Sequence, residues 1–437
     1  RAKATPNWLR VELTKPLKAY EGLTVAASFS KGGVVPNSYM TGASFVLYQH
    51  PGIKAALIGF FAMLGYYIFV WRRYGKDPLG RSLTPFYDAP EGISPAMAAM
   101  ISTMGSTSKA EALTAAIMSL AAKGYITIEE RGGGEYKLMR VDDNKISAFS
   151  KKLSADEAVV LDEIGETLTI KPRNESLVDI AAAHKNLLVS ECAGIYYNRN
   201  GMWWILGLIP LIATVHGIAS HPNVDSETAY IGMLFLTVFA AISVSVLVYA
   251  FKQIFTAPLA KKISAVFLVV WASVFSIGGI LGGSLMVMSM SWPVVAIVTL
   301  MAVLFFSMGS LMKAPTKSGR DIMDHLDGLQ YYMREVEEKV LQKFDPPQMS
   351  KELYEEYLPY AVALKVDGKW TDKFLATTGA ATLAAVGGAY VAPSWYKSVA
   401  GRAADGFSSE TFSASSVVNS INSTISAAST SNSSSGG

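Results

Sequence analysis

The serines, histidines and glycine-rich turns of this chain occur in spacings that match no reaction centre. Ser106-Thr107-Ser108-Lys109 has the S-x-x-K form of penicillin-binding enzymes, in which the first serine is the nucleophile. The companion Ser-Asp-Asn and Lys-Thr-Gly strings of those enzymes do not occur with it. Ser108 with Glu111 three positions later is instead the pattern of a helix capping box. The string therefore predicts the start of a helix and not a nucleophile.

Groups that would hold a metal ion, a cofactor or a phosphate are equally sparse. The five histidines make no HExxH and no other close metal spacing. They are His50, His184, His216, His221 and His325. Gly132-Gly133-Gly134 is not followed by Gly-Lys-Ser/Thr, so it predicts a hairpin turn and not a phosphate loop. We expect no catalytic residue, no cofactor, no metal and no identifiable small-molecule substrate.

Long apolar runs dominate the 437 residues, of which 51% are hydrophobic and 17% charged. Soluble proteins carry about 25% charged residues, so the deficit indicates surface that faces lipid. Five runs have about the 20 residues that a helix needs to cross a bilayer. These spans are Ile53–Trp71, Met202–Ser220, Tyr230–Phe251, Ile263–Met288 and Pro293–Met312. The predicted fold class is a polytopic α-helical membrane protein with five spans, a cytoplasmic α+β winged-helix-like domain and the end of an external β domain.

Lysine and arginine lie on one side of these spans, and this asymmetry predicts the orientation. The positive flanks contain Arg72, Arg73, Lys76, Lys261, Lys262 and Lys313. The loops between spans two and three and between spans four and five contain neither residue type. We therefore expect a plasma (inner) membrane protein with its N-terminus outside and its central domain and C-terminus in the cytoplasm. A Gly/Ala-rich segment, 376–407, is either a sixth span or a loop.

Four water-soluble regions precede, separate or follow the spans. Residues 1–50 alternate apolar and polar side chains as half-buried strands do, and they predict the end of an external β-rich domain. Residues 72–200 read as two helices and a hairpin, the order of a winged helix. Residues 313–375 predict a cytoplasmic helical region, which we expect to pack against the central domain. Residues 408–437 are rich in serine and predict a disordered tail.

The charge of the central domain argues against a nucleic-acid partner. Residues 72–200 contain sixteen lysines and arginines against seventeen acidic residues, and the whole chain has a net charge of +3. Binding to a phosphate backbone depends on clustered positive charge. We therefore expect the lipid bilayer and either a protein partner or a second copy of the chain as partners, and we do not expect nucleic acid.

Span four contains two overlapping pairs of small residues four positions apart. They are Gly278, Gly279, Gly282 and Gly283. Small residues at this spacing let another helix approach closely. Packing within the bundle and homodimerisation both remain open as their role.

Four sequence blocks, taken in order, resemble a known family. They are Trp71-Arg72-Arg73-Tyr74-Gly75-Lys76-Asp77-Pro78, Tyr87-Asp88-Ala89-Pro90-Glu91-Gly92-Ile93-Ser94-Pro95-Ala96, Leu120-Ala121-Ala122-Lys123-Gly124-Tyr125-Ile126, and Leu358-Pro359-Tyr360-Ala361-Val362-Ala363-Leu364 followed by Trp370. This order is similar to that of the YciQ-like predicted membrane proteins, a domain of unknown function (2207). The motif positions carried over are Gly75, Asp77, Pro78, Pro90, Pro95, Pro359, Tyr360 and Trp370.

The resemblance implies an N-terminal signal peptide, an external β-rich domain, the cytoplasmic domain and a Ser/Gly-rich tail. This chain would then lack most of the external domain. Two positions depart from the pattern: Lys365 stands where the family usually has glycine, and Leu329 where an aromatic residue is common. The resemblance brings no activity with it.

Three functions remain open after these observations. The first is a non-enzymatic envelope scaffold or signalling component with a cytoplasmic protein-interaction domain. The second is a transport accessory or permease, which requires a polar cavity among the spans. The third is a membrane-tethered nucleic-acid-binding regulator, which requires a basic reading surface.

Overall fold

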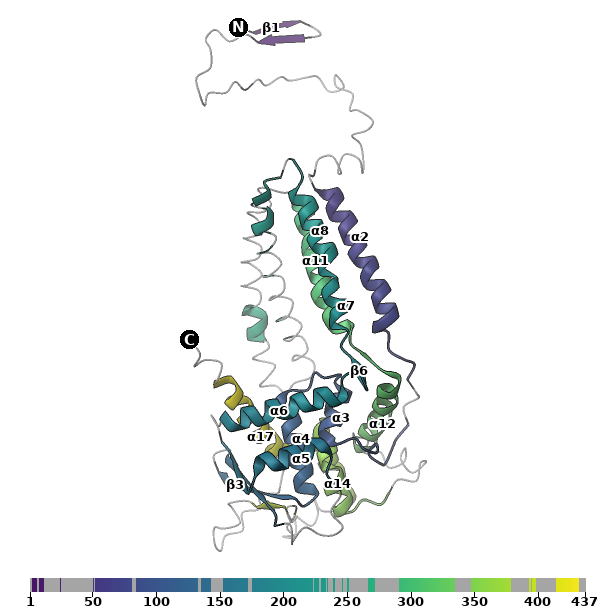
Figure 1. Ribbon diagram of the computed structural model, residues 1–437, viewed down its shortest axis with the longest axis vertical. Helices are drawn as coiled ribbons and strands as arrows, with labels where there is room; N and C mark the ends of the chain where they lie inside the picture. The colour runs from purple at the N-terminus through teal and green to yellow at the C-terminus, as the bar shows by residue number, and fades with distance from the viewer. Residues whose placement is uncertain are drawn as a thin grey trace.

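The computed structural model has a bundle of helices at one end and a compact body at the other (Figure 1). It describes residues 52–80, 84–132, 135–142, 152–171, 175–222, 291–334, 347–378, 395–397 and 414–431, together with shorter pieces before and between these ranges. Two short strands near the start, β1 (Ala2–Thr5) and β2 (Trp8–Val11), pair antiparallel.

Three helices are long and apolar enough to cross a membrane. The first is α2 (Ile53–Val70), which continues as the π-helix η2 (Trp71–Gly75). The second consists of α7 (Gly201–Leu206) and α8 (Leu208–Ala219), and the third is α11 (Trp292–Leu311). They occupy three of the five predicted spans.

The remaining two predicted spans, Tyr230–Phe251 and Ile263–Met288, lie largely outside the described residues. The same holds for the glycines of span four and two of the positive flanking residues. These are Gly278, Gly279, Gly282, Gly283, Lys261 and Lys262.

The three spans pack closely because small residues face large side chains. A Cβ atom on Gly59 of α2 would lie 1.6 Å from Thr214 Oγ1 of α8, and one on Gly207 would lie 2.0 Å from Tyr67 Oη. Tyr67 donates a hydrogen bond to the carbonyl of Trp204 at 3.0 Å. The opposite face of α2 exposes large apolar side chains, as expected of a surface in lipid.

The body is built around one buried helix, α4 (Lys109–Ala122). The elements before and after it are α3 (Pro95–Ser102), β3 (Ile126–Gly132), β4 (Glu135–Arg140), α5 (Ala155–Ile164), β5 (Thr167–Ile170) and α6 (Glu175–Cys192). The predicted starts of α3 and α4 are confirmed: Ser94 accepts a hydrogen bond from Met97 N, and Ser108 and Glu111 form the capping box. The predicted hairpin is confirmed by the antiparallel pairing of β3 with β4.

Three helices from the C-terminal part complete the same hydrophobic core. They are α12 (Lys317–Arg334), α14 (Lys351–Ala363) and α15 (Asp367–Thr378). Leu326, Tyr332 and Trp370 are buried in one cluster with residues of α3, α4 and α6. The expectation that the helical region packs with the central domain is therefore confirmed. Leu329, where the family pattern favours an aromatic residue, is also fully buried there.

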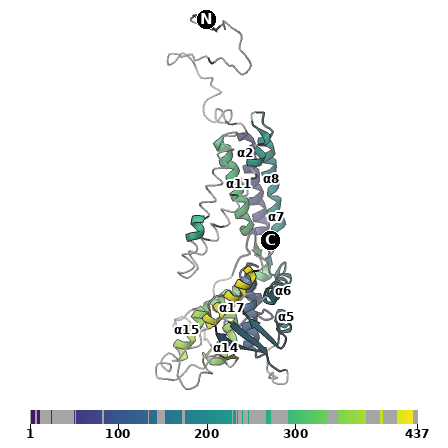
Figure 2. The same ribbon diagram turned by 90° about the vertical axis from the view of Figure 1, so that its left-hand side faces the viewer.

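The prediction of a disordered tail is wrong for Ala414–Ser431, which forms helix α17. The serine-rich composition hid an amphipathic pattern, since Val417, Val418, Ile421 and Ile425 share one face and are all buried. Figure 2 shows α17 lying against the body, and it contacts α4, α6, α15 and β5. Packing against the body stabilises a helix that the composition alone does not predict.

Most of the 376–407 segment lies outside the described residues, but its residues 395–397 belong to the body. β8 (Tyr396–Lys397) pairs parallel with β3, so the sheet has the order β5-β4-β3-β8. α15, which runs into the segment, also belongs to the body. The described parts on both sides of this segment therefore lie at the same end of the molecule.

A glycine in α12 provides a test of how tightly the body is joined to the chain that enters the spans. A Cβ atom on Gly319 would lie 1.7 Å from the carbonyl oxygen of Tyr196. We expect Gly319→Ala to lower the free energy of unfolding by about 2 kcal/mol, because two backbone segments must move apart. Thermal unfolding of the detergent-solubilised protein measures this change.

Gly368 of α15 is the matched control, because nothing lies within 4 Å of the position its Cβ would take. Gly368→Ala should leave stability unchanged or raise it by up to about 1 kcal/mol. Equal effects of the two substitutions would contradict the packing described here.

Candidate functional site: the junction between spans and body

The ends of the three spans are held together by one side chain, that of Asn200. Its amide nitrogen donates hydrogen bonds of 2.8 Å to the carbonyl of Tyr74 in η2 and of 2.8 Å to that of Met312, the C-cap of α11. Asn200 is itself the N-cap of α7 and has φ 50°, a left-handed conformation that asparagine tolerates. One residue thus ties together the body-side ends of three helices. We use "the junction" for residues 71–76, 196–201 and 311–316.

The π-helix places the first family block against the end of α11. Gly75 is buried, and a Cβ atom there would lie 2.8 Å from Trp71 Cδ1 and 3.5 Å from the carbonyl of Leu311. Arg73 lies over the ring of Tyr74, which stacks on Trp203 at 4.7 Å between centroids. Aromatic rings at the ends of spans are typical of a membrane–water interface.

The charged residues of that block are exposed beside the junction. Arg72, Arg73, Lys76 and Asp77 are exposed, and Pro78 is half-buried. None of them lines the cleft between α3, α5 and α14 that is described below. Their position at the end of a span fits the role of setting orientation that their sequence predicts.

A two-residue ladder connects the body to the spans. β6 (Tyr197–Asn198) pairs antiparallel with β7 (Ala314–Pro315), so the next residues outward, Arg199 and Lys313, also lie across from each other. Thr316 N donates to the carbonyl of Tyr196 at 2.9 Å, which extends the connection into α12. The chain entering α7 and the chain leaving α11 therefore move together.

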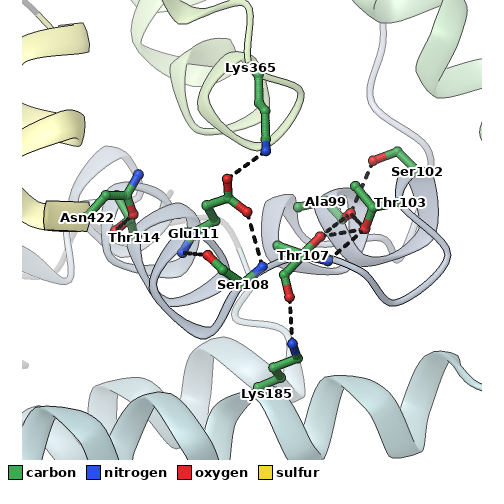
Figure 3. A network of polar contacts seen from close by, with 10 residues as sticks. All are labelled: Ala99, Ser102, Thr103, Thr107, Ser108, Glu111, Thr114, Lys185, Lys365 and Asn422. Atoms are coloured by element: carbon green, nitrogen blue, oxygen red, sulfur yellow. Dashed lines mark hydrogen bonds and ion pairs between the residues drawn. The ribbon is translucent and has the colours of Figure 1, made fainter. Parts of the chain in front are cut away.

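A network of polar contacts surrounds the N-terminus of α4 (Figure 3). Lys185 of α6 donates to the carbonyl of Thr107 at 2.7 Å, and Thr107 Oγ1 donates to the carbonyl of Ala99 at 2.6 Å. On the other side, Lys365 pairs with Glu111 at 2.6 Å. Burial would raise the pKa of Glu111, but Lys365 and the Ser108 contacts outweigh it and lower the pKa. Ser108 Oγ accepts a hydrogen bond from Glu111 N, which confirms the predicted cap at the start of α4.

The backbone conformation at Lys365 accounts for the departure from the family pattern at this position. Its φ is 61°, the left-handed region that glycine adopts without strain. The lysine accepts this conformation at the turn between α14 and α15, and its side chain reaches Glu111. The usual glycine and this lysine thus meet the same backbone requirement.

A buried polar group joins α3, α5 and α6. Ser94 donates to Asp156 Oδ2 at 2.9 Å, and His184 Nε2 lies 3.5 Å from the same oxygen. Next to it, Glu157 accepts from Ser119 at 2.6 Å and pairs with Lys123 at 2.5 Å. Asp156, Glu157 and His184 are all fully buried.

This group is not a hydrolytic triad, although it contains a serine, a histidine and an aspartate. In a triad the histidine lies between the other two and takes the proton of the serine. Here the serine and the histidine both face Asp156, and Ser94 also caps α3. Burial would raise the pKa of Asp156, but the contacts with His184 and Ser94 outweigh it and lower the pKa. The arrangement holds three helices together.

The remaining family positions border a cleft of about 980 Å³ and the core behind it. Pro90, Pro359 and Tyr360 line the cleft. Tyr360 donates a hydrogen bond to the carbonyl of Ile93 at 2.7 Å, and the buried Trp370 donates to that of Tyr354 at 3.1 Å. These positions, with the buried Pro95 at the start of α3, hold α14 against the segment that precedes α3.

Several residues that make contacts in this region carry no recognisable motif in the sequence. Asn200, Lys185, Asp156 and Asn422 have no motif spacing, because their partners are far away in the chain. Asn200 alone carries a local signal, a capping-type residue directly before a span. No group of three potential metal ligands occurs among the described residues.

The three apolar helices, the helical body and the small sheet define a helical membrane protein. A family model described as "Predicted membrane protein (DUF2207) C-terminal domain" matches residues 84–261 and 259–374, and the chain belongs to this family. Neither the curated proteins nor the solved structures contain a match.

The Asn200 contacts generate a prediction about the junction. Asn200→Asp keeps the shape but removes both N–H donors and sets a carboxylate against two carbonyl oxygens. We expect a loss of about 2–4 kcal/mol of unfolding free energy, seen as a lower melting temperature in nanodiscs and faster proteolysis near residues 76–80. Asn198→Asp, at an exposed position two residues away, should change neither quantity.

The buried Asp156 generates a prediction about pH. Its pKa is lower in the folded state than in the unfolded chain, so its charge stabilises the fold above about pH 4 and this contribution is lost as the pH falls further. Asp156→Asn should therefore cost about 2 kcal/mol at pH 7, and its deficit against wild type should shrink below pH 4. Unfolding midpoints from pH 7 to pH 3 measure this; a constant deficit would contradict it. Asp162→Asn, exposed on the same helix, is the control.

Proposed function

We propose that this protein is a non-enzymatic membrane scaffold or signalling component whose body binds amphipathic helices of proteins. The observation that carries the proposal is α17, a C-terminal helix that lies on the body as a ligand would. Helices recognised in this way present apolar side chains on one face to a groove of the binding domain.

The contacts of α17 have the form of such a complex. Val417, Val418, Ile421 and Ile425 are buried against the body, and α17 contacts α4, α6, α15 and β5. Asn422 accepts a hydrogen bond of 2.7 Å from Thr114 in the middle of α4 (Figure 3). The apolar side chains supply affinity, and this polar pair fixes the register of the helix in its groove.

The proposed arrangement in the membrane follows from charge. Arg72, Arg73 and Lys76 lie at the end of the first span, in and directly after η2, and Lys313 directly follows the cap of α11. Their positions support a cytoplasmic body and C-terminus and an external N-terminus in the plasma membrane. The proposal keeps five spans and an external β-rich domain before them.

We assign the α3–α4–β3–β4 unit a winged-helix-like fold because two helices are followed directly by an antiparallel hairpin. In such folds the second helix enters the DNA groove. Here Ala110 and every residue from Ala112 to Ala121 are buried, so α4 has no free face to present. This burial and the balanced charge favour a protein-binding use over the nucleic-acid alternative.

The described spans give a transport role little support. Lys54, in the first turn of α2, is the one lysine, arginine, aspartate or glutamate within α2, α7, α8 and α11. Intramembrane charges mark most ion and proton pathways. His216 lies in the last turn of α8, where its Nδ1 is 2.8 Å from Tyr230 Oη.

A labelled peptide of residues 411–431 tests the groove directly. It is titrated against the full-length protein and against the full-length Ile421→Asp variant, both in nanodiscs. The variant should bind the peptide at least about 10-fold more tightly, because a tethered α17 at millimolar effective concentration blocks the groove of the wild type. A peptide that itself carries Ile421→Asp should bind neither protein.

Ser423→Asp is the matched control, since Ser423 is exposed on the same helix and bonds only within it. Its peptide affinity should equal that of the wild type. Failure of the peptide to bind the Ile421→Asp protein would overturn the proposed function.

A further inference from the structure

Four cations from different parts of the chain converge at the junction. Arg199 directly precedes the cap of α7, and Lys313 directly follows the cap of α11. The register Asn198↔Ala314 sets these two residues across from each other. The other two, Lys185 of α6 and Lys109 at the start of α4, belong to the body.

Hydrogen bonds bring the body's cations to those of the spans. Lys313 Nζ donates to Ser106 Oγ at 2.9 Å, and Lys185 Nζ donates to the carbonyl of the next residue, Thr107, at 2.7 Å. Lys109 follows two positions later and is exposed, as is Arg199. The loop between α3 and α4 is therefore the surface on which the charges meet.

This convergence is electrostatically unfavourable without an anion. Burial and the charges of Arg199, Lys109 and Lys313 lower the pKa of Lys185, whereas the charge of Glu111 raises it. Glu111 is already paired with Lys365 at 2.6 Å. Like charges held this close repel one another, and a bound anion would remove the cost.

The position of the cluster at the ends of the spans indicates which class of anion it binds. It lies directly at the body-side ends of α7 and α11, beside Trp71, which is 40% exposed, and Leu311, which is 53% exposed. Aromatic and apolar side chains exposed at the end of a span mark the level of lipid headgroups. Basic pockets at this level, between spans and cytoplasmic segments, bind anionic headgroups.

We propose that Lys109, Lys185, Arg199 and Lys313 form a binding site for the phosphate-bearing headgroup of an anionic phospholipid. Two of the cations come from the body and two from the span ends, so one lipid holds the body against the membrane. The site is independent of the α17 groove and of the proposed protein partner.

The test uses the full-length protein in nanodiscs of phosphatidylcholine, with and without phosphatidylglycerol. Phosphatidylglycerol should raise the melting temperature of the wild type, and the gain should shrink as salt increases. The variant Lys185→Gln/Arg199→Gln should lose most of this gain and bind phosphatidylglycerol about 10-fold more weakly in native mass spectrometry. The stability of the variant in pure phosphatidylcholine is its baseline, because Lys185→Gln also removes the hydrogen bond to the Thr107 carbonyl.

Arg72→Gln is the control for general attraction of cations to an anionic surface, since Arg72 is exposed at the same membrane level. It should keep the gain of the wild type. A variant that retains the full gain would overturn the proposal. Equal losses in Arg72→Gln and the double variant would do so too, as would a full gain from 10 mM inorganic phosphate in phosphatidylcholine discs.

Discussion

The arrangement of spans and body depends on the amide of Asn200. Two acceptors, the carbonyls of Tyr74 and Met312, lie at the ends of two different spans, and Asn200 begins a third. Carbonyl groups at helix C-termini lack intrahelical partners, and leaving them unsatisfied near lipid is costly. A single side chain that satisfies two of them therefore fixes the spacing of three helices. The ladder of β6 with β7 then transmits that spacing to the body.

The body is organised around α4, a helix that is buried on every side. α4 is rich in alanine, and its small side chains allow α3, α5, α6, α14 and α17 to approach it closely. The two buried polar side chains of α4 are paired, Thr114 with Asn422 and Ser119 with Glu157. Because paired polar groups in an apolar core demand particular partners, they select one arrangement of these helices among several of similar hydrophobic energy.

The proposed lipid site and the proposed groove for protein partners lie at different places. The cation cluster lies beside the β6–β7 ladder at the ends of the spans, whereas α17 packs against α4 and α6 within the body. α4 is near both, since Lys185 contacts Thr107 just before the start of α4 and Thr114 in the middle of α4 contacts Asn422 of α17 (Figure 3). A protein bound in the groove and a lipid bound at the junction would thus act on the same helix.

Local patterns determined a large part of this molecule. Apolar runs place α2, α8 and α11, and the capping residues Ser94 and Ser108 place the starts of α3 and α4, because these signals depend on neighbouring residues alone. The family blocks are recognisable for the same reason. The composition of the tail predicts disorder, whereas the structure has helix α17 there. The composition is polar because the buried face of the helix consists of only a few residues, among them Val417 and Ile421. Only the tertiary structure decided that this helix has a groove, that Asn200 joins three spans and that Lys185 and Lys313 bond to neighbouring residues of one loop. Each of these contacts joins residues remote in the sequence, and their approach depends on the packing of everything between them.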